Sequence, residues 1–206
     1  EVIMSEIGIL GGSFDPFHLG HLSIAKAALK ECGLSQIILL PAKVQPFKVG
    51  RQMAASRDRI NMVSLVAKEN QNFLVSDIEA AAEEVSYTYR TLCTLKEAYP
   101  KDQLHFIMGT DSFLTLENWY RGEDLLREFS FIVGVRPGYR EEETRDKVRE
   151  LRQKYDAQIK VLHNRVLEVS STQIKENIRN GQSIRQWVPY AVERYIHEHG
   201  LYQSLY

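Results

Sequence analysis

The chain has 206 residues, of which 44% are hydrophobic and 26% charged, a balance typical of one well-cored globular domain. Its formal net charge of −1 provides no broad basic field, which argues against nucleic acid as a main partner. It has no run of 18 apolar residues, no signal-peptide pattern and only two cysteines. We therefore expect a cytoplasmic protein without a membrane partner, with Met4 as a candidate start residue.

The first predicted strand, at residues 6–10, leads into the motif Gly-Gly-Ser-Phe-Asp-Pro-Phe-His-Leu-Gly-His at residues 11–21. A helix follows, and Gly33 is expected to end it in the left-handed conformation. Strand, glycine turn and helix start form a phosphate site in many α/β proteins, because free helix N–H groups and the helix dipole attract anions. His18 and His21 are three residues apart, so both should face one side and donate hydrogen bonds to a phosphate.

Two other interpretations of this motif remain open. It can be a structural turn with two partly exposed histidines, or a metal pair. A zinc site would need a third ligand, and only Asp15 is close, in a turn where its carboxylate can equally accept bonds from backbone N–H groups. We favour a nucleotide site without a resident metal, because several unusual residues coincide.

Further along the chain, apolar runs predict strands at 36–40, 73–77, 104–108, 130–135 and 159–162. Helices are predicted at 57–71, from after Thr88 to Pro100, from 119 to 126, and at 139–156, 172–180 and 189–199. Strands that alternate with helices indicate a parallel sheet. The expected fold is α/β, a Rossmann-like parallel sheet with helices on both faces. We expect a single domain over residues 1–206, with the C-terminal helices, about 171–200, as an appendage.

The stretch Ser170-Ser171-Thr172-Gln173-Ile174-Lys175 is a second signal. Ser170 and Gln173 have the spacing of a capping box, and a plain helix cap is one explanation. A cap needs only one hydroxyl. The two further hydroxyls, of Ser171 and Thr172, and the following Lys175 therefore indicate a binding site for a triphosphate.

The motif at residues 11–21 resembles that of the (H/T)xGH nucleotidyltransferase superfamily, in the form typical of bacterial nicotinate mononucleotide adenylyltransferases. Other segments that match this family follow in order: Ser86-Tyr87-Thr88, Gly109-Thr110-Asp111-Ser112, Trp119-Tyr120, Arg136-Pro137-Gly138 and Ser170-Ser171-Thr172. The resemblance implies an enzyme of NAD biosynthesis that joins ATP and nicotinate mononucleotide. The products would be nicotinate adenine dinucleotide and pyrophosphate, formed by direct in-line attack on the α-phosphate.

The resemblance also implies roles for individual residues. His18 and His21 would be catalytic. ATP would be bound by Gly11, Gly12, Ser13, Phe14, Gly20, Gly109, Asp111, Ser171, Thr172 and Lys175. The mononucleotide would be bound by Lys48, Tyr87, Thr88, Trp119 and Arg136. Mg²⁺ would arrive with ATP. The sequence leaves a homo-oligomer open.

The chain departs from the family pattern at five positions: Gln45 replaces a proline, Phe47 a histidine, Val85 a proline, Val169 an isoleucine and Lys175 an arginine. Lysine keeps the charge but loses the bidentate fork. From the residues alone, Lys48 and Arg136 also fit solvated side chains, and Tyr87 and Trp119 fit ordinary packing. Two other functions remain open. One is a sister adenylyltransferase that uses nicotinamide mononucleotide or 4′-phosphopantetheine; the other is a non-catalytic nucleotide-binding sensor.

Overall fold

The computed structural model describes residues 4–43, 53–163 and 166–203. Its centre is a six-stranded sheet in the order β3-β2-β1-β4-β5-β6, and every neighbouring pair of strands is parallel. The strands are β1 (Glu6–Gly12), β2 (Gln36–Pro41), β3 (Phe73–Val75), β4 (Gln103–Gly109), β5 (Ser130–Gly134) and β6 (Gln158–Val161). The predicted α/β fold with a parallel sheet is confirmed.

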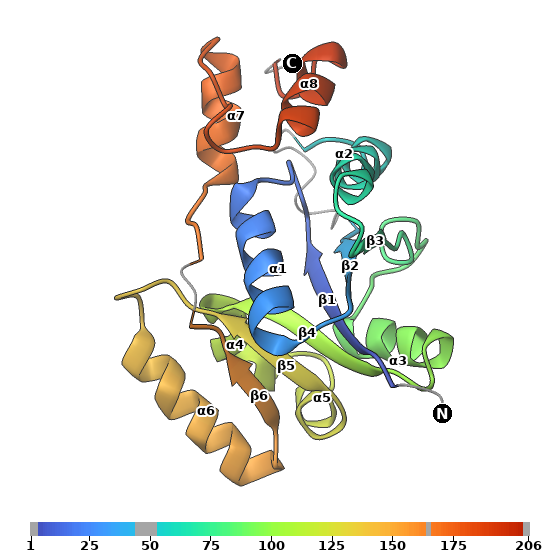
Figure 1. Cartoon of the computed structure of the whole chain (residues 1–206), viewed down its shortest axis with the longest axis vertical. Coiled ribbons are helices and arrows are strands. Elements are labelled where there is room, and N and C mark those ends of the chain that lie inside the picture. Colours follow the sequence, from blue (N-terminus) through green and yellow to red (C-terminus); the bar gives the residue numbers. More distant parts are fainter. Residues whose placement is uncertain (1–3, 44–52, 164–165, 204–206) are drawn as a thin grey trace.

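Helices cover both faces of this sheet (Figure 1). They are α1 (Leu19–Cys32), α2 (Ser56–Lys68), α3 (Thr88–Ala98), α4 (Thr110–Thr115), α5 (Gly122–Glu128), α6 (Glu141–Tyr155), α7 (Ser171–Arg179) and α8 (Tyr190–Glu198). Successive residues of a strand point to opposite faces. Ile37 and Leu39 of β2 therefore pack in one core with α1, α2, α7 and α8, while Ile38 and Leu40 pack in the other with α3, α4, α5 and α6.

Strand β1 runs two residues further than predicted, because Gly11 and Gly12 still pair with Leu40 and Pro41 of β2. The glycine motif therefore begins inside the sheet and leaves it only at Ser13. Gly33 adopts the predicted left-handed conformation, with φ of 62°, at the end of α1.

The prediction that a helix begins at residue 119 is wrong. Trp119 follows the short 3₁₀ helix Leu116–Asn118, and α5 begins only at Gly122. A side chain at Gly122 would bring a Cβ within 2.5 Å of the Leu116 and Glu117 carbonyl oxygens, so the chain makes a close turn there that only glycine fits. After β4, Gly109 occupies the N-cap of α4, and no side-chain bond caps this helix.

The C-terminal helices α7 and α8 lie beyond the carboxyl end of β1, at the end of the molecule where α1 begins (Figure 1). Ile174 and Ile178 of α7 and Val192 and Ile196 of α8 are buried in the core that α1 and α2 share. The division into one domain with an appendage stays a prediction. No helix in the described part of the chain is long and apolar enough to cross a membrane.

Candidate active site

A cavity of about 620 Å³ opens at the carboxyl ends of the strands. Its floor is formed by the ends of β1 and β4, through Gly11, Gly12, Met108 and Gly109. The strand order reverses between β1 and β4, and in open parallel sheets ligands bind in the crevice at such a switch point. The topology therefore places the predicted glycine turn at the part of the sheet best suited to hold a ligand.

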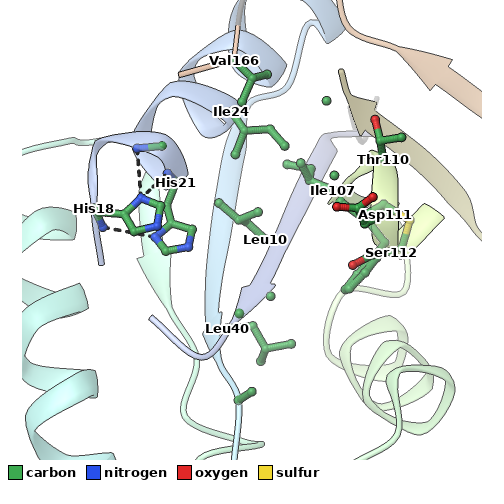
Figure 2. A pocket seen from close by; sticks show the side chains of 18 of the residues that line it. Leu10, His18, His21, Ile24, Leu40, Ile107, Thr110, Asp111, Ser112 and Val166 are labelled. Carbon is green, nitrogen blue, oxygen red and sulfur yellow. Dashed lines mark hydrogen bonds between the residues drawn. The ribbon is translucent and has the colours of Figure 1, made fainter. Parts of the chain in front are cut away.

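His18 and His21 both line this cavity and lie side by side at the first turn of α1 (Figure 2). Their rings are stacked, with centroids 3.6 Å apart and planes 15° apart. The His18 side chain caps the helix: its Nδ1 accepts hydrogen bonds from the backbone N–H groups of Gly20 at 3.1 Å and of His21 at 3.3 Å. In return, His21 Nδ1 accepts from the His18 N–H at 3.1 Å. The expectation that both side chains face one side is confirmed.

These bonds determine where each imidazole carries its proton. A backbone N–H can only donate, so Nδ1 of both rings must be an unprotonated acceptor, and the N–H donor of each neutral ring is Nε2. Burial lowers the pKa of His18 to about 4, and burial together with the neighbouring His18 holds the pKa of His21 well below its usual value. At neutral pH the cavity therefore contains two uncharged imidazoles that each present one N–H donor.

Gly20 lies between the two histidines and is required by the ring of His18. A Cβ at this position would lie 2.8 Å from His18 Cε1 and 3.0 Å from the Leu167 carbonyl oxygen. Gly20, a predicted ATP residue, therefore leaves room for the ring of the capping histidine.

The residues after β4 form the wall across from the histidines (Figure 2). A Cβ at Gly109 would meet nothing within 4 Å, so the space in front of this glycine belongs to the cavity. Asp111 lines the cavity, and its Oδ1 accepts bonds from the Tyr139 hydroxyl at 3.0 Å and from Arg140 at 3.2 Å.

The predicted mononucleotide residues other than Arg136 lie in three different places. Thr88 and Trp119 line the main cavity, and the Trp119 indole N–H donates to the Thr115 hydroxyl at 3.0 Å. Tyr87 lies beside them in a smaller neighbouring hollow, where its ring packs on that of Tyr120 at 4.5 Å. Lys48 lies outside the described residues.

Arg136 follows β5, whereas Thr88 follows β3, and β2, β1 and β4 lie between these two strands in the sheet. It lines the cavity, forms an ion pair with Glu168, lies 4.0 Å from Asp111 and stacks on the ring of Tyr139. The structure nevertheless brings Arg136 and Thr88 to the lining of one cavity.

Five predicted ATP residues do not line the cavity. Ser13 is exposed in the turn after β1, and Phe14 is fully buried against the ring of His21. Ser171 and Thr172 open α7, where the Ser170 hydroxyl accepts from the Gln173 N–H at 3.3 Å as the capping pattern predicts. Lys175 also lies outside the cavity lining, and its ammonium is paired with the buried carboxylate of Asp15.

The cavity lining includes four polar side chains outside the predicted site: Glu79, Thr110, Ser112 and Glu168. Glu79 lines the cavity beside Thr88; burial raises the pKa of this carboxyl, and its Oε1 accepts from the Thr91 hydroxyl at 2.8 Å. Thr110 is 5% exposed, and its hydroxyl has no hydrogen-bond partner among the described residues. Glu79 belongs to an acidic stretch, residues 79–84, whose spacing indicates no particular site. Thr110 lies in the motif Gly109-Thr110-Asp111-Ser112, where only Gly109 and Asp111 were predicted to bind a ligand.

We expect the Thr110→Val variant to be more stable than the wild type and to bind ATP more weakly. Valine removes a buried hydroxyl without a protein partner and keeps the side-chain shape, so the free energy of unfolding should rise by about 1 kcal/mol. A bound nucleotide would lose a hydrogen bond to that hydroxyl, and affinity should fall by about tenfold. Urea unfolding and calorimetric titration with ATP measure the two effects. Unchanged affinity would show that Thr110 does not contact the nucleotide.

Comparison with known proteins agrees with this arrangement. A family model described as cytidylyltransferase-like matches residues 9–177, which include the histidine turn and the beginning of α7. This match defines the class of protein as a nucleotidyltransferase-type α/β domain.

Similar curated proteins identify the family within this class of nucleotidyltransferases. Proteins from Lachnoclostridium phytofermentans and Carboxydothermus hydrogenoformans are 37% and 38% identical over 97% of this chain, covering 100% and 98% of their own lengths. A protein from Neisseria meningitidis serogroup B is 36% identical over 98% of this chain and all of its own length. All three carry the name "Probable nicotinate-nucleotide adenylyltransferase". The chain therefore belongs to the nicotinate-nucleotide adenylyltransferase family.

Solved structures show the same fold. Plasmodium falciparum nicotinic acid mononucleotide adenylyltransferase, complexed with NaAD, matches with a TM-score of 0.77 and 21% identity, covering 96% of this chain and 97% of that one. The same enzyme complexed with APC matches with a TM-score of 0.76. The sheet and its helices are thus the scaffold of this enzyme class.

Proposed function

We propose that the chain transfers the adenylyl group of ATP to nicotinate mononucleotide and so makes nicotinate adenine dinucleotide and pyrophosphate for NAD biosynthesis. The observation that carries this proposal is the stacked pair of neutral imidazoles, His18 and His21, at the N-terminus of α1 and at the switch point of the sheet. The names of the curated relatives support the choice of substrates.

In the proposed reaction, an oxygen of the mononucleotide 5′-phosphate attacks the α-phosphorus of ATP in line. The new bond joins this oxygen to the α-phosphorus, and the bond from the α-phosphorus to the bridging oxygen breaks, so pyrophosphate leaves with the electron pair. The attacking oxygen is already anionic, so no protein nucleophile is needed. Donors at Nε2 of His18 and His21 would stabilise charge on the reacting phosphate as the transition state forms.

The two substrates would occupy the two sides of the switch point. The pyridinium ring would stack on Trp119, since the face of an indole attracts a flat cation. Its carboxylate would be received by the N–H groups at the start of α3, beside Thr88. ATP would lie against Gly11, Gly12, Gly20 and Gly109, with its phosphates toward Ser13, Ser171 and Thr172. Arg136 would reach phosphate oxygens by exchanging the carboxylate of Glu168 for the ligand.

We propose that Mg²⁺ enters with ATP. No group of three histidine, cysteine or acidic side chains within residues 4–43, 53–163 and 166–203 is placed to hold a metal ion. Asp111 is already bound by Tyr139 and Arg140, so phosphate oxygens and water would supply most ligands. The cation would neutralise charge on the departing pyrophosphate. The proposed activity also favours a cytoplasmic location, without nucleic-acid or membrane partners.

The test is Mg²⁺-dependent release of pyrophosphate from ATP, with nicotinate mononucleotide, nicotinamide mononucleotide and 4′-phosphopantetheine compared side by side. We expect a strong preference for the acid. Equal rates with the amide would indicate a dual-specificity enzyme, and activity only with phosphopantetheine would make the chain a sister enzyme. Absence of release with all three, together with retained ATP binding, would support a nucleotide-binding sensor. Sedimentation of the same preparation would establish whether the chain forms a homo-oligomer.

A further inference from the structure

Asp15, in the turn between β1 and α1, carries a carboxylate that is only 3% exposed. Its Oδ1 accepts hydrogen bonds from the Ala54 backbone N–H at 2.9 Å and from the Tyr202 hydroxyl at 2.6 Å. Its Oδ2 lies 2.5 Å from the Lys175 ammonium, which also sits 5.2 Å from the centre of the Tyr202 ring. Removing a carboxylate from water is costly unless it is fully paired, and these three partners provide that pairing.

The partners of Asp15 come from three distant parts of the chain. Ala54 precedes α2, Lys175 belongs to α7, and Tyr202 follows α8. Two further bonds reinforce the same connection. The fully buried Arg59 of α2 donates to the Ser13 carbonyl at 2.7 Å, and the Leu19 N–H at the start of α1 donates to the Trp187 carbonyl at 2.8 Å. The turn that carries the histidines is therefore bonded to the C-terminal region through Lys175, Trp187 and Tyr202.

The side chains that flank Asp15 transmit its position to the imidazoles. Phe14 and Phe17 are fully buried, and both rings pack on the ring of His21, with centroids 4.9 Å and 5.3 Å away. His21 in turn stacks on His18. Phe14 also has a φ of 47°, an uncommon value for a bulky residue, so the turn has a defined shape that its surroundings must maintain. A shift of Asp15 would move both aromatic contacts of His21.

We propose that Lys175 and Tyr202 are positioning residues, which act through the Asp15 carboxylate to hold His18 and His21 in place for adenylyl transfer. This inference rests on the proposed function. The side chain of Lys175 is only 15% exposed, does not line the cavity and points its charge at Asp15. On this view, Lys175 neutralises Asp15 instead of contacting a phosphate.

The same geometry explains why a lysine fits where the resembling family has an arginine. A bidentate guanidinium needs both oxygens of a carboxylate. Oδ1 of Asp15 already accepts from Ala54 and Tyr202, which leaves only Oδ2 for a cation. A point-like ammonium satisfies one oxygen and still packs on the ring of Tyr202.

The test compares Tyr202→Phe with Tyr195→Phe. Tyr202→Phe removes only the hydroxyl and keeps the ion pair of Asp15 with Lys175, so the fold should survive. We expect its kcat to fall by about tenfold, with KM for ATP and for nicotinate mononucleotide within about twofold of the wild type. Tyr195, in α8, is a matched control, because its hydroxyl also donates to an acidic side chain, Asp58 of α2 at 2.8 Å, but does not touch Asp15. Its variant should lose comparable stability and keep its kcat.

Lys175→Met extends the test by removing the charge at similar side-chain length. We expect a larger loss of kcat, about 10–100-fold, with KM for ATP little changed. A rise in KM for ATP that exceeds the loss of kcat, with Tyr202→Phe like the wild type, would identify Lys175 as a phosphate ligand and overturn the proposal. Loss of stability without any loss of kcat in either variant would overturn it as well.

A second measurement does not depend on activity. The imidazole NMR signals of His18 and His21 in the free protein should shift in Tyr202→Phe and stay unchanged in Tyr195→Phe. Unmoved signals would contradict the proposal. If the wild type transfers no adenylyl group to any acceptor, the proposed function fails, while these signals still report whether Tyr202 positions the histidines.

Discussion

Replacing His21 by alanine is expected to lower kcat for adenylyl transfer by about 10²–10³-fold and to change the dissociation constant of nicotinate mononucleotide by less than about threefold. The His21 ring lines the cavity, carries its proton at Nε2 and is held by Phe14, Phe17 and the stacked His18. A donor fixed in this way acts on charge that appears only in the transition state, so its loss reduces the rate and leaves ground-state binding nearly intact. Steady-state assays of pyrophosphate release measure kcat, and calorimetric titration with nicotinate mononucleotide measures its dissociation constant.

The matched control is His197→Ala, which removes an exposed imidazole on α8. It should retain full activity. Because His21 Nδ1 also accepts a bond from the His18 N–H, part of any loss in His21→Ala could come from a loosened turn. His21→Asn retains a polar acceptor near that N–H but offers no donor where Nε2 lies. Near-wild-type kcat in His21→Asn would show that the histidine has a structural role only.

The histidine turn was predictable from sequence because its parts are contiguous. Two glycines, a helix start and histidines three residues apart fix their mutual geometry through local backbone rules, and the stacked rings agree with that expectation. The parallel sheet was predictable for a similar reason, since each strand is a short apolar run followed by a helix.

Contacts made between distant segments were not predictable in this way. Lys175 stands three residues after Thr172, so local reasoning grouped it with the hydroxyls. Its partner Asp15 lies 160 residues away and reaches it only through the packing of α7 against the start of α1. Arg136 and Thr88 are also far apart in sequence, and the order of strands in the sheet brings both to one cavity. Strand order depends on tertiary packing, which periodicity along the chain does not encode.

Acidification from pH 6.5 to pH 4 is expected to lower the free energy of unfolding by roughly 3 kcal/mol through His18 alone. Burial lowers the pKa of His18 from 6.5 to about 4 in the folded protein, and it holds the pKa of His21 well below its usual value. Between these pH values the unfolded chain binds a proton at each imidazole that the folded chain does not bind. Stability therefore rises with pH up to about 6.5 and is lost as pH falls toward 4, by about 1.4 kcal/mol per pH unit for each such proton.

Urea unfolding of the wild type and of His18→Asn between pH 4.5 and pH 7.5 measures this dependence. Asparagine retains a side-chain acceptor for the N-cap of α1, so the variant should fold. Its slope of stability against pH should be shallower than that of the wild type by the contribution of one proton. Equal slopes in wild type and His18→Asn would mean that His18 is protonated in the folded protein near pH 6, and its Nδ1 could then not accept the bonds that cap α1.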